Sequence, residues 1–100
     1  EKVQVINLSF SGRANDMLHM ALKKILARKI PVIAAAGNYG RESPPAYPAA
    51  YPGVIAVTAV DRFRRPYPDA NQGKYISFAA PGVRVPVPCG NGDICYKSGT

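Results

Sequence analysis

The sequence predicts an α/β fold, in which a segment of parallel sheet is followed by a C-terminal β-hairpin. Residues 3–8, 30–36 and 54–60 are mostly apolar runs without clean alternation of polar and apolar residues. Such runs are typical of strands that are covered on both faces of a parallel sheet. An amphipathic segment at 15–28 separates the first two runs. The order strand, helix, strand therefore indicates a right-handed parallel crossover.

The predicted helix at 15–28 has one apolar and one polar side. Its apolar residues recur at helical spacing, namely Leu18, Ala21, Leu22, Ile25 and Leu26. Asn15 or Asp16 is suited to the N-cap position, and the late Lys and Arg residues suit the negative C-terminal end of a helix. His19 lies on the polar side, so we expect it at the surface.

The chain after residue 61 is less regular. It is expected to contain a short strand at 75–79, a turn at Ala80-Pro81-Gly82, and paired strands at 84–88 and 94–97 around Gly90-Asn91-Gly92. An Asn-Gly dipeptide is a strong signal for a hairpin turn. No internal repeat or domain boundary stands out, so residues 1–100 are expected to belong to a single domain.

Composition and charge narrow the possible classes of protein. Hydrophobic residues make up 47% of the chain and charged residues 19%, which fits a folded globular segment rather than a disordered one. No apolar run approaches the ~20 residues that cross a bilayer. The net charge is +7, but only Arg62 to Arg65 form a dense cluster, so a solvated surface is favoured over a nucleic-acid partner.

The N-terminus resembles neither a protein start nor a signal peptide, so we expect the chain to be part of a longer one.

The segment Ala34-Ala35-Ala36-Gly37-Asn38 ends the second predicted strand and is the most informative place for a site. Ligands of open α/β sheets sit outside the carboxyl ends of strands, and small residues let a substrate backbone come close. An alternative is that Gly37 and Asn38 merely turn the chain, since both residue types tolerate left-handed backbone conformations. The residues alone favour the turn.

Five blocks of the sequence change this balance, because in order and spacing they resemble the subtilisin-like serine proteases, or subtilases. Ala34–Asn38 resembles the segment with the oxyanion-hole asparagine, and Val5–Phe10 is similar to the strand that lines the substrate groove. Tyr47–Val57 resembles the stretch before the next core strand, and Ala79–Val83 a further family block. Ser98-Gly99-Thr100 looks like the start of the Gly-Thr-Ser motif, whose serine would fall one residue beyond this chain.

The resemblance implies part of a three-layer catalytic domain of a serine endopeptidase. Such enzymes hydrolyse peptide bonds with a triad in the chain order aspartate, histidine, serine. None of the three is expected in this chain, so it should be inactive alone. The implied partners are an extended peptide substrate and the rest of the domain, and the implied location is secreted or periplasmic. A peptide-binding pseudoenzyme is the alternative, whereas a nucleotide-binding module is disfavoured because no glycine-rich phosphate motif follows a strand.

The resemblance also assigns roles to individual residues. Asn38 should donate a hydrogen bond to the developing oxyanion, and the Thr100 hydroxyl should assist it. The remaining substrate-binding residues are the backbone of Ser9, Phe10 and Ser11, the pocket wall of Ala35, Ala36 and Gly37, and the pocket floor at Ala46. Ser11 stands where many relatives have glycine, and Ala46 where one well-studied branch has glycine at the pocket floor. A somewhat shallower apolar pocket is one reading of these departures, and the preferred residue stays open. Asp61 falls in the connection after a core strand and should serve a turn or cap.

Three further expectations concern cofactors and covalent geometry. No cofactor is expected, although some subtilases bind calcium through carbonyls that match Ala49, Tyr51 and Val54, which leave no side-chain signature. Cys89 and Cys95 are the only cysteines and flank the hairpin signal, and subtilases are commonly exported. A disulfide is therefore predicted, with two free buried thiols as the alternative. The resemblance implies a cis peptide bond before Pro48.

Overall fold

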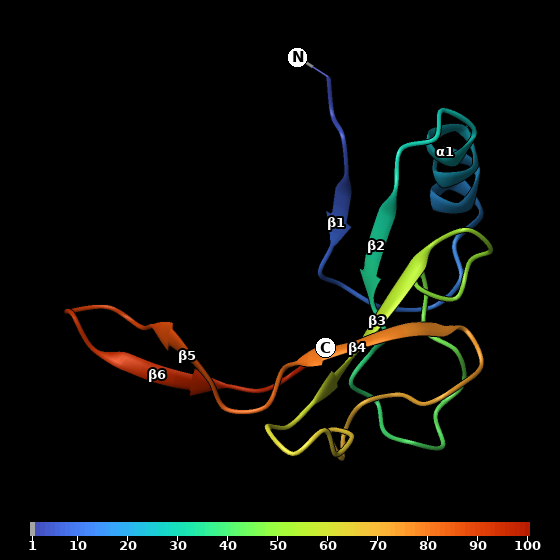
Figure 1. The fold of residues 1–100 in the computed structure, drawn as a ribbon. Helices are drawn as coiled ribbons and strands as arrows, with labels where there is room; N and C mark the ends of the chain where they lie inside the picture. The colour runs from blue at the N-terminus through green and yellow to red at the C-terminus, as the bar shows by residue number, and fades with distance from the viewer. Residues whose placement is uncertain (1) are drawn as a thin grey trace.

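The computed structural model describes residues 2–100, which form a parallel sheet, one helix and a separate hairpin (Figure 1). The elements are β1 (Ile6–Leu8), α1 (Asp16–Ala27), β2 (Val32–Ala35), β3 (Ile55–Val60), β4 (Ile76–Pro81), β5 (Val85–Pro88) and β6 (Ile94–Lys97). The first four strands are all parallel, in the order β1-β2-β3-β4. The predicted α/β class with its C-terminal hairpin is thus confirmed, with β1 to β5 starting one to three residues later than expected and β6 starting where expected.

Helix α1 begins at the cap that its sequence indicates. The side chain of Asn15 accepts a hydrogen bond from the backbone N–H of Leu18 at 2.9 Å. Leu22 is the buried residue of the helix and faces the sheet. His19 is half-buried instead of lying free at the surface, because its ring stacks on Tyr51 with the centroids 4.2 Å apart. The polar side of α1 therefore covers part of the loop that follows β2.

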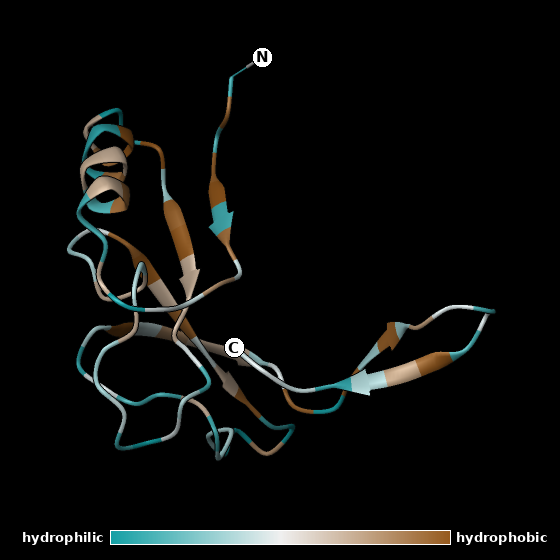
Figure 2. Ribbon diagram, turned by 180° about the vertical axis from the view of Figure 1, so that it is seen from behind, coloured by the Kyte–Doolittle hydropathy of each residue, from teal (hydrophilic) through white to brown (hydrophobic). Residues whose placement is uncertain are grey.

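The core lies between α1, the central strands and the loop before β3. It consists of small and medium apolar side chains, namely Leu22, Val32, Ala34, Ala49, Tyr51, Val54 and Ala56. The alternation along β2 places Val32 and Ala34 inside, and β2 and β3 are largely hydrophobic in Figure 2. Small side chains let the helix and the loop approach the sheet closely.

The three predicted runs differ in how far they are covered within residues 2–100. Every residue of β2 and β3 is buried or half-buried, whereas Val3 and Val5 of the first run are 58% and 50% exposed. Helix α1 is the single helix in this part of the chain, and one helix covers one face of a sheet. No helix among the described residues is long and apolar enough to cross a membrane.

Strand β4 runs two residues further than predicted, through Pro81, which pairs with Val60. The turn expected at Ala80-Pro81-Gly82 therefore starts only after Pro81. Proline lacks an N–H but is tolerated on edge strands, and β4 is the edge of the described sheet.

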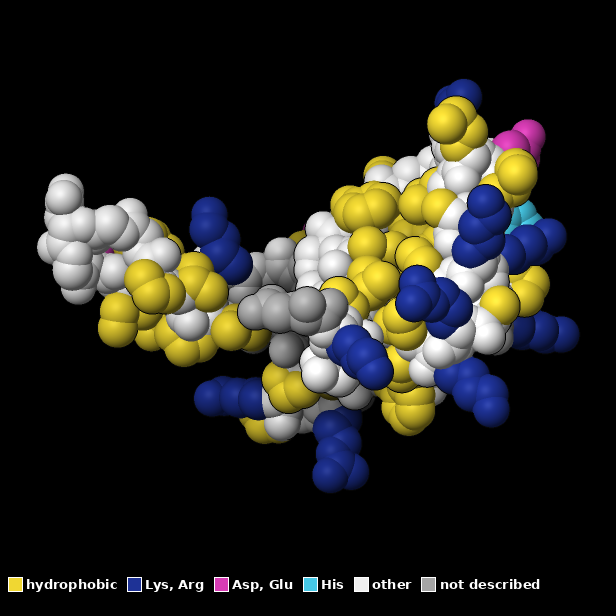
Figure 3. Space-filling model, turned by 90° about the horizontal axis from the view of Figure 1, so that it is seen from above, with side chains coloured by type: hydrophobic (Ala, Val, Ile, Leu, Met, Phe, Trp, Pro, Cys, Tyr) yellow, Lys and Arg dark blue, Asp and Glu magenta, His cyan; other side chains and the backbone are white. Residues whose placement is uncertain are grey.

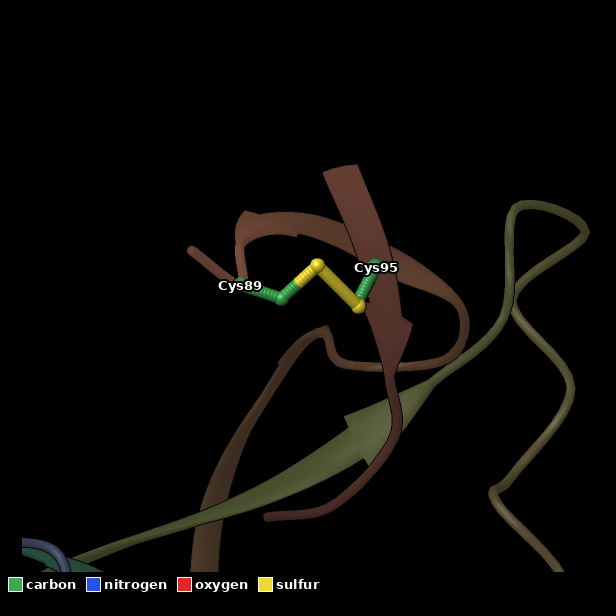
Figure 4. Close-up of a disulfide and its surroundings, with 2 residues drawn as sticks. All are labelled: Cys89 and Cys95. Atoms are coloured by element: carbon green, nitrogen blue, oxygen red, sulfur yellow. A yellow bond between two sulfur atoms is a disulfide. The ribbon is translucent and has the colours of Figure 1, made fainter. Parts of the chain in front are cut away.

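The hairpin of β5 and β6 extends away from the sheet (Figure 1). Its strands are antiparallel, and Asn91 and Gly92 both have positive φ in the turn that joins them. A disulfide joins Cys89 and Cys95 across the hairpin, with the Cα atoms 5.6 Å apart (Figure 4). The predicted disulfide is confirmed, and so is the cis bond before Pro48.

Candidate functional site

The candidate site lies where β2 ends, at the carboxyl edge of the parallel sheet. Ala36 continues the sheet, since its N–H donates to the Val57 carbonyl at 3.0 Å. The carbonyl of Ala36 accepts from the Tyr75 hydroxyl at 2.7 Å. Ligands of open parallel sheets gather at this edge. The backbone that leads to Asn38 is therefore held from both sides.

Gly37 is the first residue beyond the strand and requires glycine for two reasons. Its φ is +108°, in the range that L side chains rarely adopt. A Cβ atom on Gly37 would also lie 3.0 Å from both Ala46 Cβ and Asn71 Cγ. The Gly37 N–H donates to the Thr100 Oγ1 at 3.1 Å, which ties the end of β2 to the end of the described chain.

Asn38 has its acceptor atom occupied and its donor atom free. The Asn38 Oδ1 accepts a hydrogen bond from the Thr100 N–H at 3.0 Å. Within residues 2–100, the Asn38 Nδ2 has no hydrogen-bond partner, and the residue is exposed. A Cβ atom on Gly99 would lie 3.1 Å from that Nδ2, so a side chain there would crowd it. The contact with Thr100 thus orients the amide so that its N–H groups are available to a ligand.

Asn71 is a functional candidate that sequence reasoning missed. It is fully buried, and its backbone N–H donates to the Gly37 carbonyl at 2.8 Å. The Asn71 Oδ1 accepts from the Tyr39 N–H at 2.8 Å, and its Nδ2 donates to the Pro44 carbonyl at 3.1 Å. These bonds hold the residues on both sides of Asn38. The signal in the sequence was weak, because Asn71 lies in an irregular stretch without a motif.

The segment predicted to pair with substrate precedes the helix. Ser9 and Phe10 are exposed, and Phe10 is 51% accessible. The Ser11 carbonyl already accepts from the Tyr39 hydroxyl at 2.9 Å, so Tyr39 spans the space between this segment and the Asn38 loop. Pairing of these residues with an extended peptide stays a prediction. The exposure of Ser9 and Phe10 is compatible with it, whereas the Ser11 carbonyl is engaged by Tyr39.

A pocket of about 550 Å³ opens beside this segment. It is lined by Gly12, Arg13, Ala14, Tyr39, Ser43, Pro44, Pro45, Ala46 and Tyr47. Ala46 is 2% exposed and forms part of the lining, and its role as the pocket floor stays a prediction. The assigned wall residues are not part of this lining, and of these Ala36 and Gly37 are buried and Ala35 is half-buried. Their role in a pocket wall stays a prediction.

Asp61 has the turn role that was predicted for it. Its Oδ1 accepts from the N–H groups of Phe63 and Arg65 at 2.8 and 2.9 Å, and its Oδ2 pairs with the Arg65 Nε at 2.7 Å. The hydrogen bond from the Arg65 backbone, with that from the Arg65 side chain, lowers the pKa of this carboxyl. Asp61 is therefore a structural acid at the start of the loop after β3.

The three carbonyls that match a calcium site lie in the buried loop before β3. The Tyr51 carbonyl accepts from the Val54 N–H at 3.1 Å, which leaves it one lone pair. No group of three His, Cys, Asp or Glu side chains that could hold a metal occurs among the described residues. Carbonyl oxygens and water are ligands that a hard cation takes, and binding of calcium by these three carbonyls stays a prediction.

Comparison with known proteins agrees with this geometry. The family model described as "Subtilase family" matches residues 1–100. The chain is 37% identical to a cell wall-associated protease of Bacillus subtilis (strain 168), over 97% of this chain and 11% of that protein. It is 33% identical to an intracellular serine protease of Paenibacillus polymyxa, over 100% of this chain and 32% of that protein. The chain therefore spans about a third or less of these relatives.

A solved structure shows the same arrangement in space. The prenylagaramide maturation protease PagA superimposes with a TM-score of 0.84 at 31% identity, over 96% of this chain and 37% of that one. The parallel sheet, the strand end at Gly37 and Asn38 and the match over all 100 residues point to one conclusion. The chain belongs to the subtilase family.

Proposed function

We propose that this chain is part of a serine endopeptidase in which Asn38 stabilises the oxyanion of peptide-bond hydrolysis. One observation carries the proposal: the Asn38 Oδ1 is bound to the Thr100 N–H, whereas its Nδ2 has no hydrogen-bond partner within residues 2–100 and the residue is exposed. A side-chain amide held in this way presents N–H donors without reorganisation when negative charge develops. Membership of the subtilase family supports the same role.

Thr100 has two functions in this proposal. Its backbone N–H orients the Asn38 amide, and its Oγ1 accepts from the Gly37 N–H. A hydroxyl that accepts in this way still has its hydrogen to donate. The Thr100 hydroxyl can therefore contribute a second, weaker donation toward the oxyanion. The nucleophile, its base and the acid that orients the base belong to other residues of the protein, so residues 1–100 alone are inactive in this proposal.

The substrate is an extended peptide that binds along residues 9–11. The side chain that precedes the scissile bond enters toward Ala46, whose methyl group makes the floor shallower than a glycine would. Tyr39 narrows the entrance through its hydrogen bond to the Ser11 carbonyl. A medium-sized apolar side chain fits this lining best, since prolines, alanines and tyrosines dominate it.

The chemistry proposed here needs no cofactor, and calcium bound by the carbonyls of Ala49, Tyr51 and Val54 would act on stability alone.

A secreted or periplasmic location is also proposed. The disulfide supports it, because such bonds persist in oxidising compartments. The relatives include both a cell wall-associated and an intracellular protease, so an assay of export from the source cell is the direct test.

The test of the oxyanion role is Asn38→Ala in the full-length protein. The kcat should fall by about 10² to 10³, the magnitude known for the oxyanion-hole asparagine of subtilisin in this same family. The KM should change much less, because the hydrogen bond strengthens mainly in the transition state. Asn38→Asp should be at least as harmful, since a carboxylate faces the oxyanion with like charge. If Asn38→Ala kept the kcat of the unaltered protein, the oxyanion role would be wrong and Asn38 would be a turn residue. If the unaltered full-length protein bound peptides without cutting them, it would be a pseudoenzyme.

A further inference from the structure

A second concave surface lies on the hairpin side of the molecule and has no role in the proposed function. It has a volume of about 600 Å³ and runs between the loop after β3 and the hairpin. Its lining consists of Asp61, Arg62, Phe63, Arg65, Val83, Arg84 and Tyr96, which we call the arginine groove. It shares no residue with the pocket beside Ala46.

The arginine groove carries an excess of positive charge. Arg65 is paired with Asp61, whose carboxyl keeps its charge because hydrogen bonds from Arg65 lower its pKa. Arg62 and Arg84 have no carboxylate partner within the described residues. Elsewhere the basic residues are spread over the surface, as the face in Figure 3 illustrates. The groove therefore combines concave shape with two unneutralised guanidinium groups.

Aromatic rings hold the guanidinium groups of all three arginines of the groove in place. The Cζ atoms of Arg62 and Arg65 lie 4.6 and 5.1 Å from the ring centroid of Phe63, and that of Arg84 lies 5.5 Å from the centroid of Tyr96. A guanidinium over a ring keeps its N–H edges free for hydrogen bonds to a carboxylate. A nucleic-acid base would have to displace these groups to stack on the same ring faces. The arrangement thus favours acidic side chains over nucleic acid.

The arginine groove adjoins the candidate oxyanion segment through the start and end of the hairpin. The Arg84 N–H donates to the Ser98 Oγ at 2.9 Å, and the Gly99 N–H donates to the Gly82 carbonyl at 2.9 Å. Thr100, the next residue, contacts Asn38. The residues proposed to bind the peptide before the scissile bond contribute nothing to this groove. A chain of contacts through residues 98–100 thus connects the groove to Asn38.

We propose that the arginine groove binds acidic side chains of the peptide on the carboxyl-terminal side of the scissile bond. This inference rests on the proposed endopeptidase function for its orientation, since that function defines which part of the substrate lies beyond Asn38. The groove adds charge selectivity to a protease whose other pocket is apolar.

The test compares two peptides in the full-length protein at low salt. They share all residues up to the scissile bond and carry either two glutamates or two glutamines among the residues that follow it. The glutamate peptide should have a kcat/KM about 2 to 25 times higher, since each of two exposed ion pairs contributes up to roughly fivefold. The variant Arg62→Gln/Arg84→Gln should abolish this ratio and leave the glutamine peptide unaffected. Lys23→Gln on α1 removes one charge elsewhere and should keep the ratio.

Direct binding separates a failure of this inference from a failure of the proposed function. A labelled peptide that contains only the residues after the scissile bond is titrated by fluorescence anisotropy. Binding should be tighter for the glutamate form, weaken with salt and be lost in Arg62→Gln/Arg84→Gln. If neither peptide is cleaved but this pattern holds, the endopeptidase proposal fails and the groove stands as an acidic-peptide site. Equal binding of the glutamate and glutamine peptides would overturn the proposal that the arginine groove binds acidic side chains. Binding of a single-stranded oligonucleotide without binding of the acidic peptide would overturn it as well.

Discussion

The parallel sheet and the hairpin are stabilised in different ways. In the sheet, β2 and β3 bury Val32, Ala34 and Ala56 against the helix and the loop. In the hairpin most residues are exposed, and Ile94 is 68% accessible. Its order comes from the antiparallel pairing, the turn and the disulfide. Tertiary packing thus orders the region of the candidate oxyanion site, whereas local interactions order much of the arginine groove.

The two regions meet at a pair of glycines. A Cβ atom on Gly82 would lie 2.5 Å from the Gly99 carbonyl oxygen and 2.7 Å from Ala59 Cβ. Such contacts leave no room for a side chain, so the ends of the hairpin are pressed against β3. This junction places Thr100 beside Asn38 although the body of the hairpin extends away from the sheet. Changes within each region should therefore have separable effects.

The largest expected effect is that of Gly37→Ala, with Gly90→Ala in the hairpin as its matched control. Both glycines have φ near +100°, but a Cβ atom on Gly90 would meet nothing within 4 Å. Gly37→Ala should cost about 2 to 6 kcal/mol from strain and overpacking together, whereas Gly90→Ala should cost only the ~1 to 3 kcal/mol of strain. Urea unfolding measures the loss of stability in each variant, and kcat shows whether the loss reaches the candidate site. Equal losses of stability in Gly37→Ala and Gly90→Ala would refute the role of packing at Gly37.

Asn71→Ala should have the next largest effect, because it leaves the Tyr39 N–H and the Pro44 carbonyl without their partner. An unsatisfied buried group costs about 1 to 3 kcal/mol, and since both of these bonds are only partly buried, each loss should lie near the lower end of that range. We expect the kcat to fall tenfold or more with little change in KM, since Asn71 positions the residues around Asn38 rather than touching substrate.

Gln72→Ala is the control for that variant, because Gln72 is the exposed neighbour of Asn71. It should leave both stability and kcat unchanged. If Asn71→Ala lowered stability but kept the kcat of the folded fraction, Asn71 would be a structural residue without influence on the oxyanion site.

Removal of the disulfide by Cys89→Ala/Cys95→Ala should affect the hairpin and spare the sheet. A loop of this length restricts the unfolded chain by about 2 kcal/mol. Hydrogen exchange should accelerate in β5 and β6 and stay unchanged in β2 and β3. Faster exchange throughout the sheet would show that the two regions unfold together.

The smallest expected effect is the pH dependence of the loop after β3. The pKa of Asp61 is lowered by its hydrogen bonds with Arg65, so its stabilising contribution is present above the unfolded pKa of about 3.9 and is lost as the pH falls through the folded value. Exchange of the Phe63 and Arg65 amides, measured relative to the intrinsic rate of an unprotected amide at the same pH, should therefore rise at acidic pH in the wild type. In Asp61→Asn that rise should be absent, and its persistence would assign it to another group.

The sequence by itself determined the elements and the strand end that carries the site. Apolar runs, helical periodicity and the Asn-Gly turn are local signals, and each one led to an element that the structure contains. The asparagine cap at residue 15 and the cysteine pair were equally local. The family resemblance added the cis bond before Pro48, which residue patterns alone leave undecided.

Only the tertiary structure decided which distant groups meet. Asn71 lies 33 positions after Asn38, and nothing in its neighbourhood marks it as the buried partner of Tyr39 and Pro44. The stacking of His19 on Tyr51 and the continuation of β4 through Pro81 were missed for the same reason. Hydrogen bonds and ring contacts between separated segments depend on how the sheet packs. Packing is a property of the whole chain, and no local pattern records it.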